Sequence, residues 1–116
     1  SYEDFKKVEI RIGEIKSAEK IEGSDKLLRL NVNFGALPAG GDRQVLSGIA
    51  VYFPAPALLV GKRYPFVTNL APRTIMGLES HAMILAVGGP ASAGASDEET
   101  PFALFETTGE PGARVR

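Results

Sequence analysis

The 116-residue sequence contains no cysteine, no tryptophan and a single histidine, His81. Without cysteine the chain cannot form disulfides, thiolate zinc sites or iron–sulfur clusters, and it cannot use a cysteine nucleophile. One histidine at a strand edge is typical of a surface or partly packed residue rather than of a catalytic dyad or a metal site. We therefore expect a non-catalytic protein without a cofactor or a metal ion. The lack of cysteine also fits a reducing compartment, and we expect a cytoplasmic protein.

Long apolar segments are missing as well. No stretch approaches the roughly 20 apolar residues that a membrane-spanning helix needs. The first residues, Ser1 to Phe5, do not have the composition of a signal peptide. We therefore expect a soluble protein that does not interact with membranes. Because the chain begins with serine rather than methionine, the sequence is compatible both with a free-standing protein and with a segment of a longer one.

An overall excess of positive charge is absent too. The formal net charge is −1, whereas nucleic-acid-binding domains usually carry a basic excess. The charge is nevertheless uneven: residues 43–87 hold four basic and one acidic side chain, and residues 88–116 hold two basic and five acidic ones. A local basic face can act despite a neutral total, because charges interact over about 8 Å at physiological salt. The alternative is scattered, solvated charge.

Two segments show the period-two alternation of apolar and polar residues that is typical of half-buried strands. The first runs from Val8 to Ile15, with a bulge permitted at Gly13, and the second covers residues 28–34. Further short strands are expected over residues 43–49, 63–70 and 81–87. Loops rich in small or turn-forming residues are expected over residues 35–42, 71–77 and 88–100, the last of them mobile.

One short helix is expected after Phe53, because Pro54 and Pro56 stand early in the segment and Gly61 closes it. Five strands with one small helix indicate an all-β fold, a five-stranded barrel of the oligonucleotide/oligosaccharide-binding (OB) type. We expect a single domain over residues 1–116, with its core at about residues 4–87.

A C-terminal extension follows over residues 88–116. Its acidic residues, Asp97, Glu98, Glu99, Glu106 and Glu110, form a run with no basic residue among them, and the chain becomes apolar again at Phe102, Leu104 and Phe105. These three side chains require burial, either against their own barrel or against a partner subunit. We therefore expect a homodimer in which the extension helps to form the interface.

Several motifs in one order resemble a known family. They are Lys7-Val8-x-Ile10-Arg11-Ile12-Gly13, Gly23-Ser24-Asp25-Lys26-Leu27-Leu28, Arg43-x-Val45-x-Ser47-Gly48, Asn69-Leu70-x-Pro72-Arg73 and Gly77-Leu78-Glu79-Ser80-x-x-Met83. Together they resemble the tRNA-binding domain that is appended to many methionyl-tRNA synthetases, and that also occurs as free-standing dimeric proteins and in the endothelial monocyte-activating polypeptide group. The resemblance covers residues 4–87 strongly and the remainder weakly.

The resemblance implies a non-catalytic OB-fold module that binds tRNA by its shape and backbone. It acts either alone or attached to a synthetase catalytic body, and it forms a homodimer. The RNA-contacting residues that the resemblance and the residue types imply are Lys26, Arg43, Ser47, Arg63, Asn69, Arg73, Ser80 and Met83. Tyr52 and Phe53 offer flat surfaces for bases, with core packing as the alternative. The alternative function is a protein-interaction or chaperone-like dimeric module.

Overall fold

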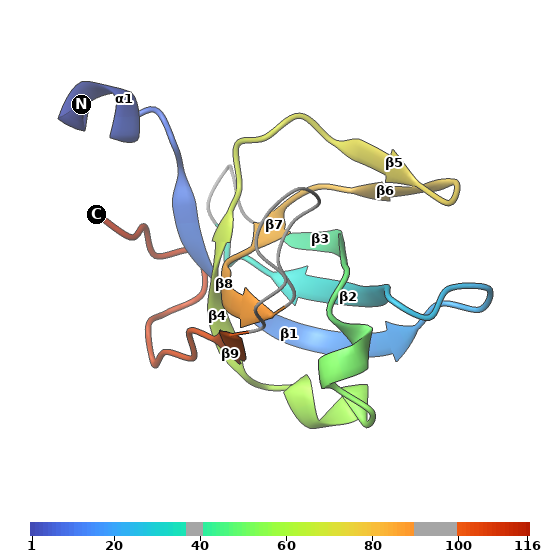
Figure 1. Ribbon diagram of the computed structural model, residues 1–116. Helices are drawn as coiled ribbons and strands as arrows, with labels where there is room; N and C mark the ends of the chain where they lie inside the picture. Colours follow the sequence, from blue (N-terminus) through green and yellow to red (C-terminus); the bar gives the residue numbers. More distant parts are fainter. Residues whose placement is uncertain (37–40, 90–99) are drawn as a thin grey trace.

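The computed structural model describes residues 1–36, 41–89 and 100–116, and its main element is a curled antiparallel sheet (Figure 1). The strands of this sheet lie in the order β3–β2–β1–β4–β7. They are β1 (Ile10–Lys20), β2 (Leu28–Asn33), β3 (Asp42–Ser47), β4 (Arg63–Val67) and β7 (Met83–Ile84). The edge strands β3 and β7 also contact each other, so the sheet curls into a partly open barrel. The expected all-β fold of the OB type is confirmed.

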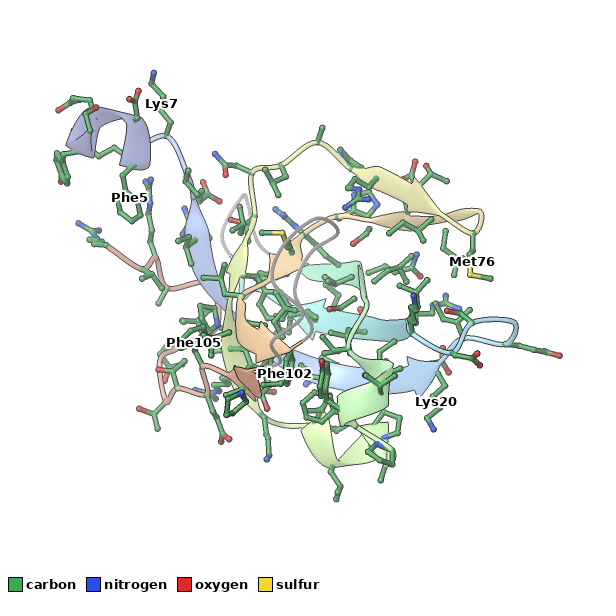
Figure 2. The ribbon with its side chains drawn as sticks, viewed as in Figure 1. Phe5, Lys7, Lys20, Met76, Phe102 and Phe105 are labelled. Atoms are coloured by element: carbon green, nitrogen blue, oxygen red, sulfur yellow. The ribbon has the colours of Figure 1, made fainter. Side chains whose placement is uncertain are left out.

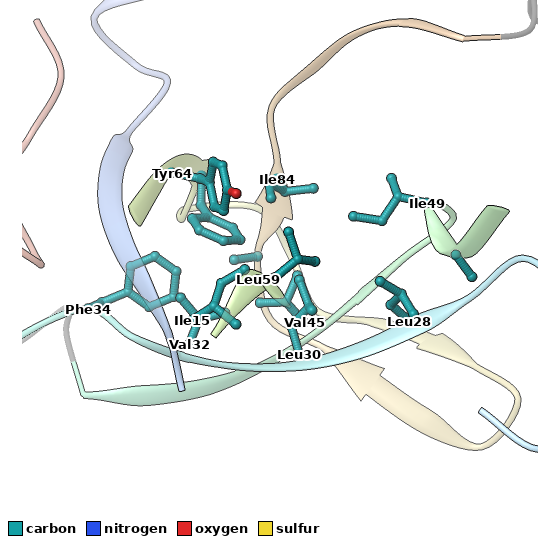
Figure 3. Close-up of a cluster of buried hydrophobic side chains, with 13 residues drawn as sticks. Ile15, Leu28, Leu30, Val32, Phe34, Val45, Ile49, Leu59, Tyr64 and Ile84 are labelled. Atoms are coloured by element: carbon teal, nitrogen blue, oxygen red, sulfur yellow. The ribbon is translucent and has the colours of Figure 1, made fainter. Parts of the chain in front are cut away.

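The core fills the inside of this barrel. Alternate residues of β2, Leu28, Leu30 and Val32, are fully buried, as the period-two pattern predicts. The rings of Phe34 and Phe66 meet edge to face, with their centroids 5.2 Å apart. Figure 3 shows these side chains converging from the curled strands. Burial of a large apolar side chain contributes about 1.5 to 3 kcal/mol, so this cluster is the main source of stability.

Gly13 lies inside the barrel rather than at a bulge. It pairs in regular register with Tyr64 of β4, and the irregularity in β1 falls between Ile15 and Ser17. A β-carbon at residue 13 would lie 2.7 Å from Cε1 of Phe34. The bulge that Gly13 would permit does not form there, and glycine stands here because the core side chains approach the backbone closely.

The short helix expected near Pro56 is two 3₁₀ turns, η1 (Ala50–Tyr52) and η2 (Pro56–Leu59). Among the described residues, the one α-helix is α1 (Tyr2–Phe5), at the N-terminus. Prolines lack an N–H group, and the few residues left before Gly61 hold only a tight turn. The expected short helical segment before Gly61 is therefore present as η2.

The loop expected over residues 71–77 is one half of a β-hairpin. Strands β5 (Arg73–Ile75) and β6 (Leu78–Ser80) pair around Met76 and Gly77. These two residues have φ angles of +52° and +77°, as a two-residue hairpin turn of type I′ requires. The prediction missed this hairpin because methionine is not a typical residue at such a position.

The strand expected over residues 81–87 is divided. Its first part is β7, and its second part belongs to β8 (Ala86–Gly89), which pairs with β9 (Thr100–Leu104). Most of the expected mobile loop, including residues 97–99 of the acidic run, lies outside the described residues. Part of the loop expected over residues 35–42 also lies outside them.

The end of the C-terminal extension packs on its own barrel. The backbone of Ala113 accepts a hydrogen bond from Ile12, and Val115 donates one to Ile10, both along the part of β1 that β2 does not reach. Phe102 and Leu104 pack against the core, whereas Phe105 is 49% exposed. The C-terminal extension is therefore part of the folded structure of a single chain.

Candidate nucleic-acid interface

Two projecting segments flank one face of the barrel. The loop between β1 and β2 and the β5–β6 hairpin extend in the same direction (Figure 1). At their ends, the methyl carbon of Met76 lies 3.7 Å from the position that a β-carbon on Gly23 would occupy. Met76 marks the tip of the hairpin in Figure 2. OB folds bind oligonucleotides on the face of their second and third strands, between the loops that correspond to these two segments.

Each of the two segments carries an exposed cation. Lys26 follows a turn in which the hydroxyl of Ser24 accepts hydrogen bonds from the backbone N–H groups of Lys26 and Leu27. Arg73 lies on β5, opposite Ser80. Within the described residues, neither cationic side chain forms an ion pair or a hydrogen bond. Both positive charges are therefore free to meet a phosphate.

Two more of the predicted residues remain available. Met83 of β7 is 47% exposed. Ser47 ends β3 opposite Leu28, is half-buried, and its hydroxyl makes no hydrogen bond among the described residues. Lys26, Arg73, Met83 and Ser47 thus keep polar or apolar groups that an RNA ligand could contact.

Arg43 and Ser80 are engaged inside the molecule. The Arg43 guanidinium donates to the backbone oxygen of Thr68 at 2.8 Å and lies over the ring of Phe34, 5.4 Å from its centroid. The buried Ser80 hydroxyl accepts a hydrogen bond from the N–H of Leu46 at 3.0 Å. Both side chains hold the segment around the β5–β6 hairpin against β3.

Asn69 is exposed, but its amide links β4 to the N-terminal segment. Its nitrogen donates to the backbone oxygen of Lys7 at 2.7 Å, and its oxygen accepts from the N–H of Glu9 at 2.9 Å. Glu9 in turn accepts hydrogen bonds from Thr68 and Arg11, which hold the pKa of its carboxyl below the ordinary value. The amide of Asn69 therefore already has a structural use.

Arg63 lies at the opposite end of β4 and is bound to carboxylates. Its guanidinium donates to Glu14 of β1 at 3.0 Å, and this hydrogen bond lowers the pKa of Glu14. A second carboxylate, Glu110, lies 3.9 Å away, and neighbouring Lys62 pairs with Glu106 at 3.7 Å. The acidic extension thus neutralises part of the basic middle of the sequence.

Tyr52 and Phe53, which the sequence suggested as surfaces for RNA bases, pack against other residues of the chain. The rings of Tyr52 and Phe102 stack in parallel with centroids 4.0 Å apart, and Phe53 meets Phe102 edge to face. The core-packing interpretation of Tyr52 and Phe53 is correct. Tyr52, Phe53 and Phe102 are therefore held as one cluster against the core, which restricts their use for stacking on a base.

The sequence analysis missed a row of polar residues on the outer face of the sheet. Ser17 of β1 lies opposite Asn31 of β2, and Asn31 lies opposite Gln44 of β3. We call these three residues the polar row. Arg29, the next outward residue of β2, donates to the Gln44 side chain at 2.8 Å. The alternation of β2 already indicated that Arg29 and Asn31 face outward, but only the strand order reveals the row.

The described residues contain no cluster of histidine, aspartate or glutamate that could hold a metal ion. Among the same residues, no helix has the length and apolar character needed to cross a membrane. His81 is half-buried, and its Nε2 lies 3.2 Å from the Glu79 carboxylate.

Comparisons with known proteins agree with this geometry. Residues 10–114 match a family model described as a putative tRNA-binding domain. Methionine–tRNA ligase of Methanoregula boonei is 51% identical over 116 residues, and that of Helicobacter pylori is 53% identical over 85 residues. The chain spans 15% of the length of the first and 12% of the second.

Solved structures show the same relationship over the whole chain. A protein related to methionyl-tRNA synthetase from Pyrococcus horikoshii is 33% identical, with a TM-score of 0.79 over 100% of this chain and 96% of that chain. The chaperone CsaA of Bacillus anthracis is 27% identical, with a TM-score of 0.75 over 100% of this chain and 97% of that chain. The sequence and the fold together show that this chain belongs to the tRNA-binding domain family.

Proposed function

We propose that the chain is a non-catalytic module that binds tRNA by its folded shape and its backbone. The observation that carries this proposal is the position of Lys26 and Arg73 on the two segments that flank the outer face of β2 and β3. Both cations are exposed, and neither has an ion pair or a hydrogen bond among the described residues. The rings of Tyr52 and Phe102 stack on each other. Binding therefore depends on phosphate contacts and shape rather than on base stacking.

The module serves a synthetase or acts alone. Its relatives include methionine–tRNA ligases, of which it spans a small part, and a Pyrococcus protein of similar length. Attached to a synthetase, it would raise the local concentration of tRNA near a catalytic centre in another part of the protein. The cytoplasm is the compartment that we propose for either form.

A homodimer is part of this proposal. Phe105 and Val87 of the C-terminal region are 49% and 50% exposed, and such side chains gain free energy when a partner covers them. Two copies would duplicate the cationic site and raise the affinity for one tRNA if both can reach it. Light scattering at tens of micromolar should give twice the chain mass of 12.3 kDa, and a monomer mass would remove this part of the proposal.

The direct test is a fluorescence-anisotropy titration with unfractionated tRNA at two salt concentrations. Each phosphate contact contributes about 0.7 to 0.9 log units of affinity per log unit of salt. The Lys26→Ala/Arg73→Ala variant should therefore bind more weakly and have a salt slope smaller by about 1.4 to 1.8.

The control variant is Lys6→Ala/Lys7→Ala. It removes two lysines whose side chains lie near Glu3 and Asp4 at the N-terminus. This variant should keep the affinity and the slope of the wild-type protein, because these charges lie away from the two projecting segments. Equal binding by wild type and the Lys26→Ala/Arg73→Ala variant would contradict the proposed site.

A protein-interaction module is the second candidate. A groove between α1 and the C-terminal segment combines the apolar side chains of Tyr2, Phe5, Val8 and Val115 with the cations Lys6, Arg114 and Arg116. One solved relative is called a chaperone. An unfolded polypeptide should compete with tRNA, or bind beside it, if this function is present. The absence of polypeptide binding would leave the RNA-binding function as the better explanation.

A further inference from the structure

From the polar row we infer a site that contacts the ribose 2′-hydroxyl groups of a bound RNA. This inference rests on the proposed function, because it assigns a part of the RNA to a surface between the two projecting segments. Ser17, Asn31 and Gln44 lie side by side across three adjacent strands. Strands are about 4.8 Å apart, so the row is roughly 10 Å long.

The row lies in a shallow hollow of the outer face, which is lined by Ser17, Glu19, Arg29, Leu30, Asn31 and Gln44. The β5–β6 hairpin borders this hollow, because the side chain of Gln44 donates to the backbone oxygen of Glu79 at 2.9 Å. Arg73 therefore lies on the hairpin that Gln44, at one end of the row, contacts. An RNA backbone held by Arg73 would pass beside the row.

The hydrogen-bonding groups of the row suit a hydroxyl ligand. Both Ser17 and Asn31 are exposed. Among the described residues, the Ser17 hydroxyl and the Asn31 side-chain amide make no hydrogen bond, so both groups are available to a ligand. A serine hydroxyl donates and accepts, and an asparagine amide has two donors and one acceptor oxygen. The ribose 2′-hydroxyl also donates and accepts, and it distinguishes RNA from DNA.

The charges around the row favour a hydroxyl over an isolated phosphate. Arg29 is the cation of the hollow, but its Nη1 lies 3.7 Å from Glu19. Its Nε already donates to Gln44 at 2.8 Å. The two charges offset each other, so the hollow contributes little to attraction of an anion. Arg29 instead orients the Gln44 side chain at the end of the row.

A neutral contact has an experimental signature that a phosphate contact lacks. Loss of a phosphate contact lowers the salt slope, because fewer counterions are released on binding. Loss of a contact to a 2′-hydroxyl lowers the affinity by a similar factor at each salt concentration and leaves the slope unchanged. Substitutions in the row and at the cations therefore give different results.

The test uses two ligands, a tRNA transcript and the same transcript made with 2′-fluoro pyrimidine nucleotides. Fluorine retains the A-form sugar geometry but cannot donate a hydrogen bond. Wild-type protein should bind the hydroxyl transcript about twofold to tenfold more tightly, as expected for one or two lost hydrogen bonds. The Ser17→Ala/Asn31→Val variant should bind both transcripts equally and keep the wild-type salt slope.

Two further variants complete the design. Lys26→Ala/Arg73→Ala should lose salt slope but keep the preference for the hydroxyl transcript. Thr108→Val changes an exposed hydroxyl residue of the C-terminal segment and should behave like wild type. Valine is suitable at residue 31 of β2 because it favours strands. Circular dichroism of Ser17→Ala/Asn31→Val should therefore show an unchanged fold.

The inference is overturned if wild-type protein binds both transcripts equally, or if the Ser17→Ala/Asn31→Val variant keeps the wild-type preference. Either result, obtained with salt-sensitive binding to tRNA, would leave the proposed function intact. If wild-type protein does not bind tRNA at low salt, the proposed function fails, and this inference fails with it.

Discussion

The buried hydroxyl of Ser80 on β6 accepts a hydrogen bond from the backbone N–H of Leu46 on β3, at 3.0 Å. It also donates to the backbone oxygen of Ala82 at 3.1 Å. This side chain is one of the contacts that join the base of the β5–β6 hairpin to the barrel, together with the hydrogen bond from Gln44 to Glu79. Arg73 lies opposite Ser80 on the hairpin, so the position of Arg73 depends on these hydrogen bonds.

Replacement of Ser80 by alanine should therefore reduce stability. The N–H of Leu46 would lose its partner in a buried position, which costs about 1 to 3 kcal/mol. Urea unfolding measures this loss. Ser47→Ala is the control, because its half-buried hydroxyl makes no hydrogen bond among the described residues, and it should change the free energy of unfolding by less. Equal stability of Ser80→Ala and wild type would show that the hydrogen bond between Ser80 and Leu46 contributes nothing to the free energy of unfolding.

The Glu9 carboxylate should make stability depend on acid pH. It accepts hydrogen bonds from Thr68 at 2.7 Å and Arg11 at 2.9 Å, which lower its pKa below the ordinary value of 4.5. A lowered folded-state pKa stabilises the protein above the unfolded value, and this contribution disappears as the pH falls through the folded-state pKa. The free energy of unfolding should therefore fall with pH below about 4.5.

The Glu9→Gln variant should have a flatter dependence of stability on pH over the same acid range. Urea unfolding at several pH values gives the curves for both proteins, and Glu3→Gln, which removes an exposed carboxylate of α1, is the control. Parallel curves for wild type and Glu9→Gln would contradict the role assigned to this carboxylate.

Replacement of Met76 by asparagine should increase stability. Met76 has a φ of +52° at the hairpin turn, a conformation that is unfavourable for most side chains and that asparagine tolerates well. We expect a gain of about 0.5 to 1 kcal/mol in a thermal or urea unfolding experiment. Met83→Asn is the matched control, because Met83 is also exposed but lies in the extended strand β7. A loss of stability in Met76→Asn would contradict the assigned backbone strain.

Replacement of Gly13 by alanine should be strongly destabilising. The new methyl group would lie 2.7 Å from a carbon of Phe34 and 3.1 Å from a carbon of Phe66. Overpacking of this kind costs about 1 to 3 kcal/mol or more. Gly48→Ala adds the same group at a position where, apart from the two chain neighbours, no described residue has an atom within 4 Å, and it should be nearly neutral. Similar unfolding curves for the two variants would contradict the close packing around Gly13.

The strands that form the core were predictable because their signal is local. Alternating residues of β1 and β2 must point to opposite sides of a sheet, so the apolar ones identify the buried side without knowledge of the partner strands. The turn at Ser24, Asp25 and Lys26 is also a local feature, because the Ser24 hydroxyl caps nearby backbone groups. The barrel, the exposed position of Lys26 and the family relationship could therefore be recognised in the sequence.

The hydrogen bonds and ion pairs of the polar residues depend on partners that are far away along the chain. Arg63 and Glu14, which are 49 residues apart, meet only because β1 and β4 are neighbours. Asn69 binds Lys7 across 62 residues. No local pattern distinguishes such a side chain from an exposed residue that is free to contact RNA.

The sequence by itself determined the all-β class, the buried faces of the main strands and the membership of the family, because these follow from alternation and from motifs. Only the tertiary structure decided that Arg43 and Arg63 have partners within the chain, while Lys26 and Arg73 have none in the part of the chain that the structure describes. It also placed Ser17, Asn31 and Gln44 in one row. Side-chain pairing depends on strand order and register, and these are set by the packing of the whole barrel.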